Sequence, residues 1–188
     1  MKNCSVFVLF LFSLFGHSQN QPAPLVGSKN VEDALFKINA LVPGASYELG
    51  LGKNTTVNFE VRLNVGARGG SGVDTKVGIL PGAQIDFRYF TNFNRRRSKE
   101  KNISGNSGNY LAVGNQFLFG DAVIGNLDYS SSLNHIAWIA YGIQRTRPKG
   151  FYWGVSFGPG LYTDDFDSEF TLFADLRLGW VLKKKNRN

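Results

Sequence analysis

Acidic and basic side chains recur two residues apart in three segments. Residues of these types at this spacing could take part in acid–base chemistry or in ion pairing, more than those of any other pattern in the chain. In each segment an acid precedes an arginine: Glu60 and Arg62, Asp86 and Arg88, Asp175 and Arg177. Two carboxylates can share the roles of general acid and base. A guanidinium beside each carboxylate instead favours charge-assisted hydrogen bonds within ion pairs. With one further acid these residues form our predicted ion-pair network: Glu48, Glu60, Arg62, Asp86, Arg88, Asp175 and Arg177.

A single histidine, His135, remains if the amino-terminal segment that contains His17 is removed, as we expect. Residues 130–132 before it are all serine, and Asp128 is near. A serine, a histidine and an acid are the parts of an activated nucleophile, so an enzyme that uses His135 is one hypothesis. A serine-rich loop beside a lone histidine is more commonly only a polar loop. We therefore predict no catalytic residues and keep the enzyme as the alternative.

Clustered charges occur in three other segments. The acidic segment 164–169 offers oxygen ligands for a divalent cation, but it lacks the spacing and the glycine of an EF-hand loop. The basic runs at 95–101 and 183–187 suit nucleic acid by charge, yet no aromatic stacking platform interleaves with them. The one cysteine, Cys4, lies in the expected signal segment, so the mature chain offers no thiolate ligand. We predict no metal, no cofactor and no nucleic-acid partner.

The charged pairs lie in segments whose apolar and polar residues alternate. In residues 55–67 every odd position from Val57 to Ala67 is apolar, while the even positions are polar or glycine. Successive side chains of a strand point to opposite faces, so this segment has one apolar face and one charged face. Such a strand must lie between a very apolar medium and a polar one.

The same alternation predicts an all-β chain of eight strands. Pro43 and Gly44 interrupt the alternation, because the apolar positions are even before them and odd after them. We interpret this change of phase as a turn between two strands. The expected spans are 35–42, 45–52, 55–69, 78–91, 109–120, 134–146, 150–163 and 169–182.

The amino terminus predicts export of the protein. Lys2 precedes the apolar run Val6–Phe15, and small residues follow at Gly16 and Ser18. This pattern is typical of a secretory signal peptide, and the run is shorter than the roughly 20 residues of a membrane-spanning helix. We expect a signal peptide at 1–18, a flexible leader at 19–34, the β-domain at 35–182 and a basic tail at 183–188.

Alternation alone does not separate a membrane barrel from a secreted soluble binding barrel. The apolar face points outward in a membrane barrel and inward in a soluble one, and both give the same alternating pattern. The charges of the polar face nearly balance, with Lys37 added if the first strand holds, so they can neutralise one another in a narrow interior. Glycine and serine on that face suit a small bore. Rings near the strand ends are typical of interfacial girdles. The expected girdles are Tyr89, Phe90, Phe93, Tyr110, Phe151, Tyr152, Trp153 and Trp180 at one end, and Tyr129, Trp138 and Tyr162 at the other.

The connections between the expected strands separate by charge. If both termini lie on the periplasmic side, as is usual for bacterial barrels, the outer connections hold seven acids against Lys76. The acids are Asp74, Asp121, Asp128, Asp164, Asp165, Asp167 and Glu169. The periplasmic connections and the tail hold Lys53, Arg95, Arg96, Arg97, Lys99, Lys101, Arg147, Lys149, Lys183, Lys184, Lys185 and Arg187 against Glu100. Basic runs of this kind are more commonly solvated turns and tails, and contact with anionic cell-wall or lipid groups is the alternative interpretation.

The chain resembles the small outer-membrane β-barrel proteins of Gram-negative bacteria, with the eight-stranded transmembrane domain of the OmpA type as the nearest shape. The leader around Gly16–Gln19 and the stretches Tyr47–Gly50 and Gly105–Leu111 are similar to barrels of Bacteroidota. The resemblance implies an antiparallel up-and-down barrel in the outer membrane, with outer-membrane lipid and the barrel-insertion machinery as partners. It departs from the pattern at its end, since Trp180 is the last aromatic and a basic tail follows.

We therefore expect an integral outer-membrane component with a plugged, charge-lined interior. Its expected role is structural or in surface contact, since wide channels belong to barrels of 16 or more strands. The alternatives are a lipid-modifying outer-membrane enzyme that uses His135 and a secreted soluble ligand-binding barrel.

Overall fold

The computed structural model describes residues 29–70, 73–119, 122–127 and 133–185, and these residues are almost entirely β-structure. The expected signal peptide and residues 19–28 of the leader lie outside them. In this part of the chain the strands are β1 (Ala34–Asn39), β2 (Gly44–Gly50), β3 (Thr55–Gly70), β4 (Val73–Phe90), β5 (Gly108–Phe119), β6 (Ile124–Gly125), β7 (Leu133–Thr146), β8 (Phe151–Thr163) and β9 (Ser168–Lys185). A short helix, α2 (Phe93–Arg97), and a 3-10 turn, η1 (Pro148–Gly150), join them. None of the helices in the described residues is long and apolar enough to cross a membrane.

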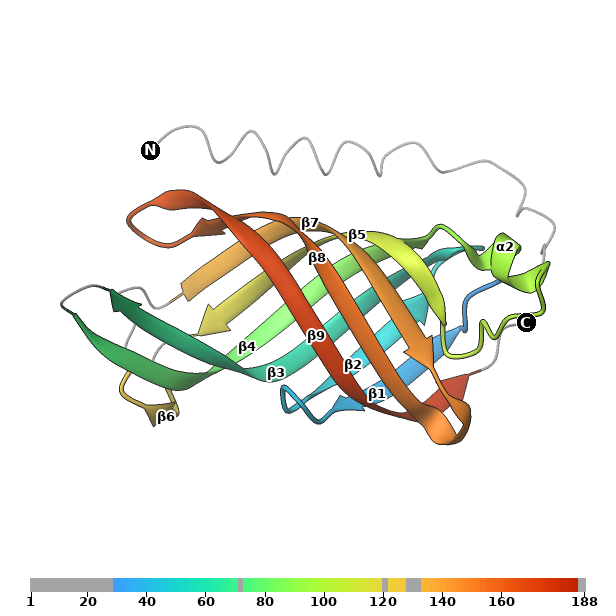
Figure 1. Ribbon diagram of the computed structural model, residues 1–188, viewed down its shortest axis with the longest axis horizontal. Coiled ribbons are helices and arrows are strands. Elements are labelled where there is room, and N and C mark those ends of the chain that lie inside the picture. Colours follow the sequence, from blue (N-terminus) through green and yellow to red (C-terminus); the bar gives the residue numbers. More distant parts are fainter. Residues whose placement is uncertain (1–28, 71–72, 120–121, 128–132, 186–188) are drawn as a thin grey trace, which may run out of the picture.

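The nine strands form one antiparallel sheet that closes into a ring (Figure 1). With β6 left aside, strands that follow one another in the chain pair with each other, and β9 pairs with β1. The two-residue β6 pairs only with β4 at the margin of the sheet. Closure therefore rests on the other eight strands, and antiparallel neighbours with short connections explain the order.

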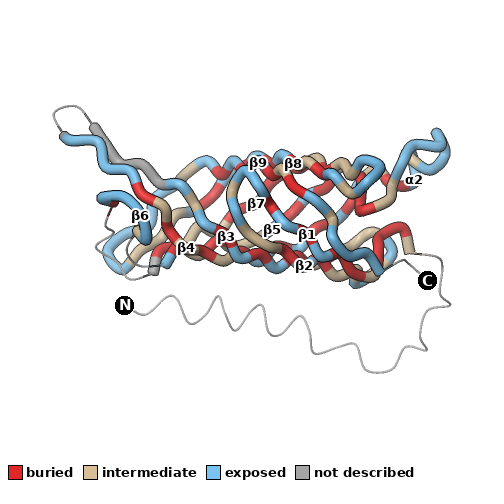
Figure 2. Tube along the Cα trace, turned by 90° about the horizontal axis from the view of Figure 1, so that it is seen from below, coloured by how far each residue is buried: buried red, intermediate tan, exposed pale blue. Residues whose placement is uncertain are grey.

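Buried and exposed residues alternate along the strands of the ring (Figure 2), and the charged residues of these strands are the buried ones while large apolar residues are exposed. On β3, Phe59 is 46% exposed whereas the neighbouring Glu60 is 3% exposed. The alternation of strand side chains forces this division once one face is chosen. The ring is thus inverted relative to a soluble protein, which buries its apolar side chains.

Several boundaries differ from those predicted from the sequence. Strand β4 begins at Val73 instead of 78, because its pairing with β3 continues to Val73, opposite Gly70. Strand β9 runs to Lys185, so the described part of the basic tail belongs to a strand that pairs with β1. The described leader residues Asn30, Val31 and Glu32 are buried instead of flexible. Strand β1 ends at Asn39, three residues earlier than expected.

The expected aromatic girdles are wrong for five of their rings. Phe90, Phe93, Tyr110, Trp138 and Tyr152 are all buried within the ring. The four that lie on strands occupy even positions that share the inward face with the charged residues, so alternation decides their direction and nearness to a strand end does not. Tyr129 lies outside the described residues.

Glycines at the paired positions of the neighbouring strand make room for two of these inward rings. A Cβ on Gly142 would collide with the ring of Tyr110, and one on Gly114 would meet Trp138 at 2.6 Å. The Trp138 and Phe173 rings stack with centroids 4.1 Å apart at one level of the interior. In a narrow ring, Tyr110 and Trp138 each fit because the paired residue on the adjacent strand is a glycine.

Candidate functional site

Eight charged side chains form a continuous chain of ion pairs through the interior, which we call the interior charge network. It begins on β1 and β2, where Lys37 Nζ lies 2.6 Å from Glu48 Oε2. Thr56 and Asn106 donate hydrogen bonds to the other Glu48 oxygen at 2.9 and 2.8 Å. Arg88 Nη1 approaches Glu48 Oε2 at 3.6 Å and carries the network onward to β4.

Arg88 and Asp86 form the middle of the network. The Nε atom of Arg88 donates to Asp86 Oδ2, while Gln84 donates to Asp86 Oδ1 at 2.9 Å. Arg88 also donates to Gln144 at 3.1 Å, and its guanidinium lies 5.1 Å from the centroid of the Tyr110 ring. This distance is within the range of a cation–π contact. The Arg88 charge is therefore held from three sides.

Arg177 connects the middle of the network to its far end. Its Nε atom donates to Glu60 Oε2 at 3.1 Å, and its Nη2 atom lies 2.7 Å from Asp175 Oδ2 and 3.8 Å from Asp86 Oδ1. Arg62 Nη1 then reaches Asp175 Oδ1 at 2.8 Å, and it is 3.6 Å from Glu60 Oε1. Asn39 donates to the same Glu60 oxygen at 2.6 Å.

The network is balanced in charge and excluded from solvent. Its members are Lys37, Arg62, Arg88 and Arg177 with Glu48, Glu60, Asp86 and Asp175, and none is more than 8% exposed. Removing one partner of a buried pair leaves an uncompensated charge, which costs about 3–5 kcal/mol. The structure brings all seven residues of the sequence-derived set together with Lys37. Their carboxylates are engaged by cations, which suits sealing and rigidity better than proton transfer.

Two segments cover the end of the ring nearest α2. The backbone N–H of Glu32 donates to Asn106 Oδ1 at 2.8 Å, and the N–H of Gly105 donates to Glu32 Oε1 at 3.1 Å. Lys184 lies 3.4 Å from the same Glu32 oxygen. Gly105 and Asn106 both adopt positive φ angles, +60° and +55°, which turn the β4–β5 connection inward. Asn30–Glu32 and the Gly105–Ser107 turn thus form an end plug, whose residues are buried.

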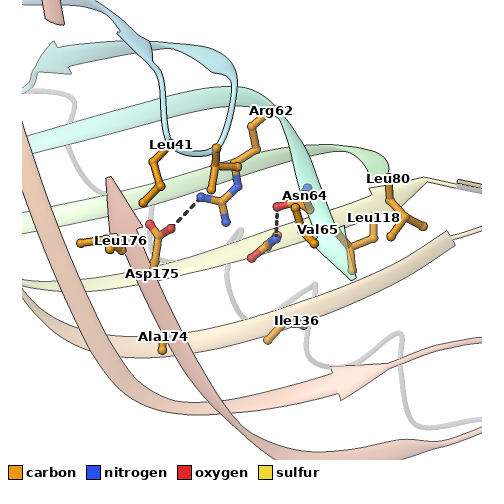
Figure 3. A pocket seen from close by; sticks show the side chains of 12 residues that line it. Leu41, Arg62, Asn64, Val65, Leu80, Leu118, Ile136, Ala174, Asp175 and Leu176 are labelled. Carbon is orange, nitrogen blue, oxygen red and sulfur yellow. Dashed lines mark hydrogen bonds and ion pairs between the residues drawn. The ribbon is translucent and has the colours of Figure 1, made fainter. Parts of the chain in front are cut away.

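The other half of the interior contains a cavity of about 360 Å³ (Figure 3). Arg62 and Asp175 lie on one side of it, where the interior charge network ends. Gln116 donates to Asn64 Oδ1 at 2.9 Å in its polar part. Apolar side chains supply much of the remaining lining: Leu41, Val42, Val65, Leu80, Leu118, Ile136 and Leu176. The cavity therefore combines a charged floor with apolar walls.

The other candidates from the sequence lie apart from this cavity lining. His135 is on the outer face of β7, where its Nδ1 atom is 3.3 Å from Asn115 Nδ2 and its ring lies beside Phe117. Asp128 and serines 130–132 lie outside the described residues. Asp164 accepts hydrogen bonds from the backbone of residues 166 and 167, so this carboxylate stabilises its own turn. Among the residues the structure describes, no three histidine, cysteine or acidic side chains gather as metal ligands.

Several network partners were missed by sequence reasoning. Asn106 lies in a connection with no alternation, so only its glycine neighbours gave a signal that the backbone turns there. Gln144 and Thr56 occupy even positions on the charged face, and the alternation rule alone places them inside. Tyr110 and Tyr152 obey the same rule and were assigned to a girdle instead.

Comparisons of the chain with protein-family models, with curated proteins and with solved structures find no match.

Proposed function

We propose that the chain is an integral outer-membrane protein of a Gram-negative bacterium, built as an eight-stranded up-and-down β-barrel, with a structural and surface-contact role. The observation that carries the proposal is the inverted distribution of its side chains. Val61, Ile139 and Leu172 are each more than 60% exposed, while the interior charge network is buried. Soluble monomers rarely expose apolar patches larger than a few hundred Å². In a membrane, hydrocarbon would surround the ring, so these apolar side chains would not be exposed to water.

Strand length agrees with the thickness of a membrane. A tilted membrane strand needs about 9–11 residues. Strands β3, β4, β5, β7, β8 and β9 have 12 to 18 residues each. Ring closure also satisfies the backbone groups that hydrocarbon cannot hydrate.

A sealed interior separates this protein from a channel. The interior charge network crosses the ring from β1 and β2 to β9, and the end plug closes one mouth. An ion that passed would have to displace paired charges, which is costly in a desolvated interior. We expect negligible conductance.

The charge of the two ends sets the proposed orientation and partners. The acidic β8–β9 connection lies at the end of the ring opposite α2 and its basic residues (Figure 1). We place the acidic end at the cell surface and the basic end in the periplasm, facing the anionic cell wall. Lipid surrounds the wall of the barrel, and the barrel-insertion machinery assembles it.

Fractionation tests membrane insertion. The full chain, expressed in a Gram-negative host, should be recovered in the outer membrane, and its unheated form should migrate faster on a denaturing gel than its boiled form. Planar bilayers that contain the purified protein should show no conductance steps, with a porin as the positive control. Recovery in a soluble fraction without a heat-dependent shift would overturn the proposal in favour of a secreted soluble barrel.

Cysteine labelling tests the orientation. The only native cysteine, Cys4, is in the expected signal segment, so Asp165→Cys and Lys99→Cys each introduce one exposed thiol at opposite ends. A membrane-impermeant maleimide applied to intact cells should label the Asp165→Cys variant, and it should label the Lys99→Cys variant only after lysis. The reverse pattern would contradict the orientation.

A further inference from the structure

The wall of the ring has a notch above the short β1–β2 hairpin. Strand β3 pairs with β2 only as far as Arg62, opposite Gly44, and Leu63 N–H donates to Pro43 O just beyond. Strand β9 pairs with β1 only from Gly179, and Ala40 N–H donates to Leu178 O. Residues 64–70 and 168–177 therefore pair with a strand on one side only. The wall notch is the space between these two edges, with the turn 40–43 as its base.

The wall notch is wide, and in the proposed barrel it lies within the membrane. Two missing strands separate the edges by three interstrand spacings, or about 14 Å. Strand β1 has 6 residues and β2 has 7. At about 3.3 Å per residue and a tilt near 40°, they rise about 15–18 Å, less than the 25 Å apolar band of a barrel. Figure 1 shows the hairpin ending between the much longer β3 and β9.

Exposed strand edges are costly at this depth. The N–H and C=O groups of successive residues point to opposite sides of a strand, so every second residue points to the same side. Leu63 N–H points to the β2 side, where it donates to Pro43 O, and the N–H and C=O groups of Val65 therefore point to that side as well. Hydrocarbon cannot form hydrogen bonds with such groups, so leaving them without a partner is strongly unfavourable. The wall notch must therefore admit water or a polar ligand group.

The cavity of Figure 3 lies directly inside the wall notch. Its lining includes Leu41 and Val42 from the base and Val65 and Leu176 from the two edges. Arg62 and Asn64 line it from β3, and each has a buried nitrogen without a hydrogen-bond partner in the described residues, Nε and Nδ2 respectively. Arg62 is only 7% exposed. Of the buried polar atoms without a hydrogen-bond partner in the described residues, these two donors and Asp175 Oδ2 belong to residues that line the cavity. A ligand oxygen that enters the cavity can accept from the two donors.

An apolar groove on the outer face adjoins the cavity. Its lining is Pro43, Gly44, Ala45, Val61, Arg62, Leu63, Pro81, Gly82, Ala83 and Phe119, so Arg62 is shared with the cavity. The apolar surface of the groove thus lies beside the two cavity donors that have no hydrogen-bond partner in the described residues, Arg62 Nε and Asn64 Nδ2. An amphiphile with an oxygen-rich head and a hydrocarbon chain matches both.

We infer that the wall notch is a lateral binding site for an anionic amphiphile drawn from the membrane. The head enters the cavity, where small rotations of Arg62 and Asn64 direct their free N–H groups at its oxygens. The chain lies over Leu63 and Pro81 in the outer groove. Both oxygens of Asp175 are already paired with Arg62 and Arg177, so they repel the head less than a free carboxylate would. The inference rests on the proposed membrane location.

Binding of dodecyl phosphate to the purified barrel tests the inference. The protein is kept in a neutral maltoside detergent, its folded state is verified by the heat-dependent gel shift, and binding is measured by native mass spectrometry and by titration calorimetry. We expect saturable binding of one molecule and no binding of inorganic phosphate. Asn64→Leu should weaken binding about tenfold or more, because a hydrogen bond to a charged head is lost. Asn109→Leu at the opposite end is the matched control and should bind as the parent does.

Closing the entrance gives a second measurement. Leu41→Trp fills the base of the wall notch and changes no residue of the interior charge network, so the variant should fold, keep its gel shift and lose binding. Absence of saturable binding to a barrel with an intact gel shift would overturn the site and leave the membrane proposal standing. Equal binding of inorganic phosphate would show a free-anion site and also overturn it. Absence of the gel shift itself would count against the proposed function instead.

Discussion

Replacing Arg177 by methionine provides the sharpest test of the interior charge network. Arg177 contacts Glu60, Asp175 and Asp86, and it is 6% exposed. Methionine keeps most of the volume and removes the charge, so Glu60 loses its nearest cation while Asp175 keeps Arg62. The network then holds three cations and four anions, and one uncompensated charge in a desolvated site corresponds to a loss of about 3–5 kcal/mol in the free energy of unfolding.

A second substitution isolates the charge effect. In the double variant Arg177→Met/Glu60→Leu the remaining network has three cations and three anions, so it is balanced again. Its loss of stability should be smaller than the sum of the two single losses by about 2 kcal/mol or more, which is a large coupling for residues in contact. Arg95→Met, on exposed α2, is the matched control and should change stability by less than about 0.5 kcal/mol.

Urea unfolding in detergent, followed by tryptophan fluorescence and the gel shift, measures these differences. A loss below about 1 kcal/mol for Arg177→Met would equal that of an exposed ion pair. That result would mean that water fills the interior, and the argument from desolvation would be wrong. Additive single losses in the double variant would equally refute the direct pairing of Arg177 with Glu60.

Three further substitutions test other parts of the structure. Val61→Arg, on the outward face, should cost about 2–4 kcal/mol in bilayers, whereas Val61→Ala should cost much less; equal effects on urea unfolding would argue against contact with lipid. Gly142→Val should cost at least about 1–3 kcal/mol, because its side chain collides with the Tyr110 ring, and Gly142→Val/Tyr110→Ala should recover part of the loss in the same assay. His135→Ala should leave the lipid A of the host unchanged by mass spectrometry, since the ring contacts Asn115 and Phe117, neither of which is a nucleophile or an acid; an altered lipid A would restore the enzyme hypothesis.

The alternation of side chains carried most of the fold prediction. Period two is a local property of a strand, so residues 55–67 alone decided that Glu60 and Arg62 share a face opposite Phe59. The change of phase at Pro43 and Gly44 correctly predicted a turn between β1 and β2, but the turn lies at residues 40–43 and Gly44 already belongs to β2. The alternation rule predicts neither β6 nor α2, because both lie in connections whose residues do not alternate.

Pairing within the network was not available from sequence spacing. Asp86 does contact Arg88 two residues away, yet the Nη1 atom of Arg62 lies closer to Asp175 of β9 than to Glu60 of its own strand. Contacts across the ring depend on its closure and stagger, which a single strand does not encode. The buried leader residue Glu32 was missed for the same reason, because Gly105 and Asn106, which bind it, are brought near by closure.

The pairing of β9 with β1 has a consequence for biosynthesis. Lys37 pairs with Val181 in the closed ring. Strand β1, the first of the described strands to be translated, therefore completes its pairing only after β9, the last, has been synthesised. Until those 18 residues of β9 emerge, β1 and β8 each present a bare edge, which is a template for aggregation. The sheet therefore cannot close before Ser168–Lys185 has been synthesised, and a truncated product that ends before Ser168 would leave both of these edges unpaired.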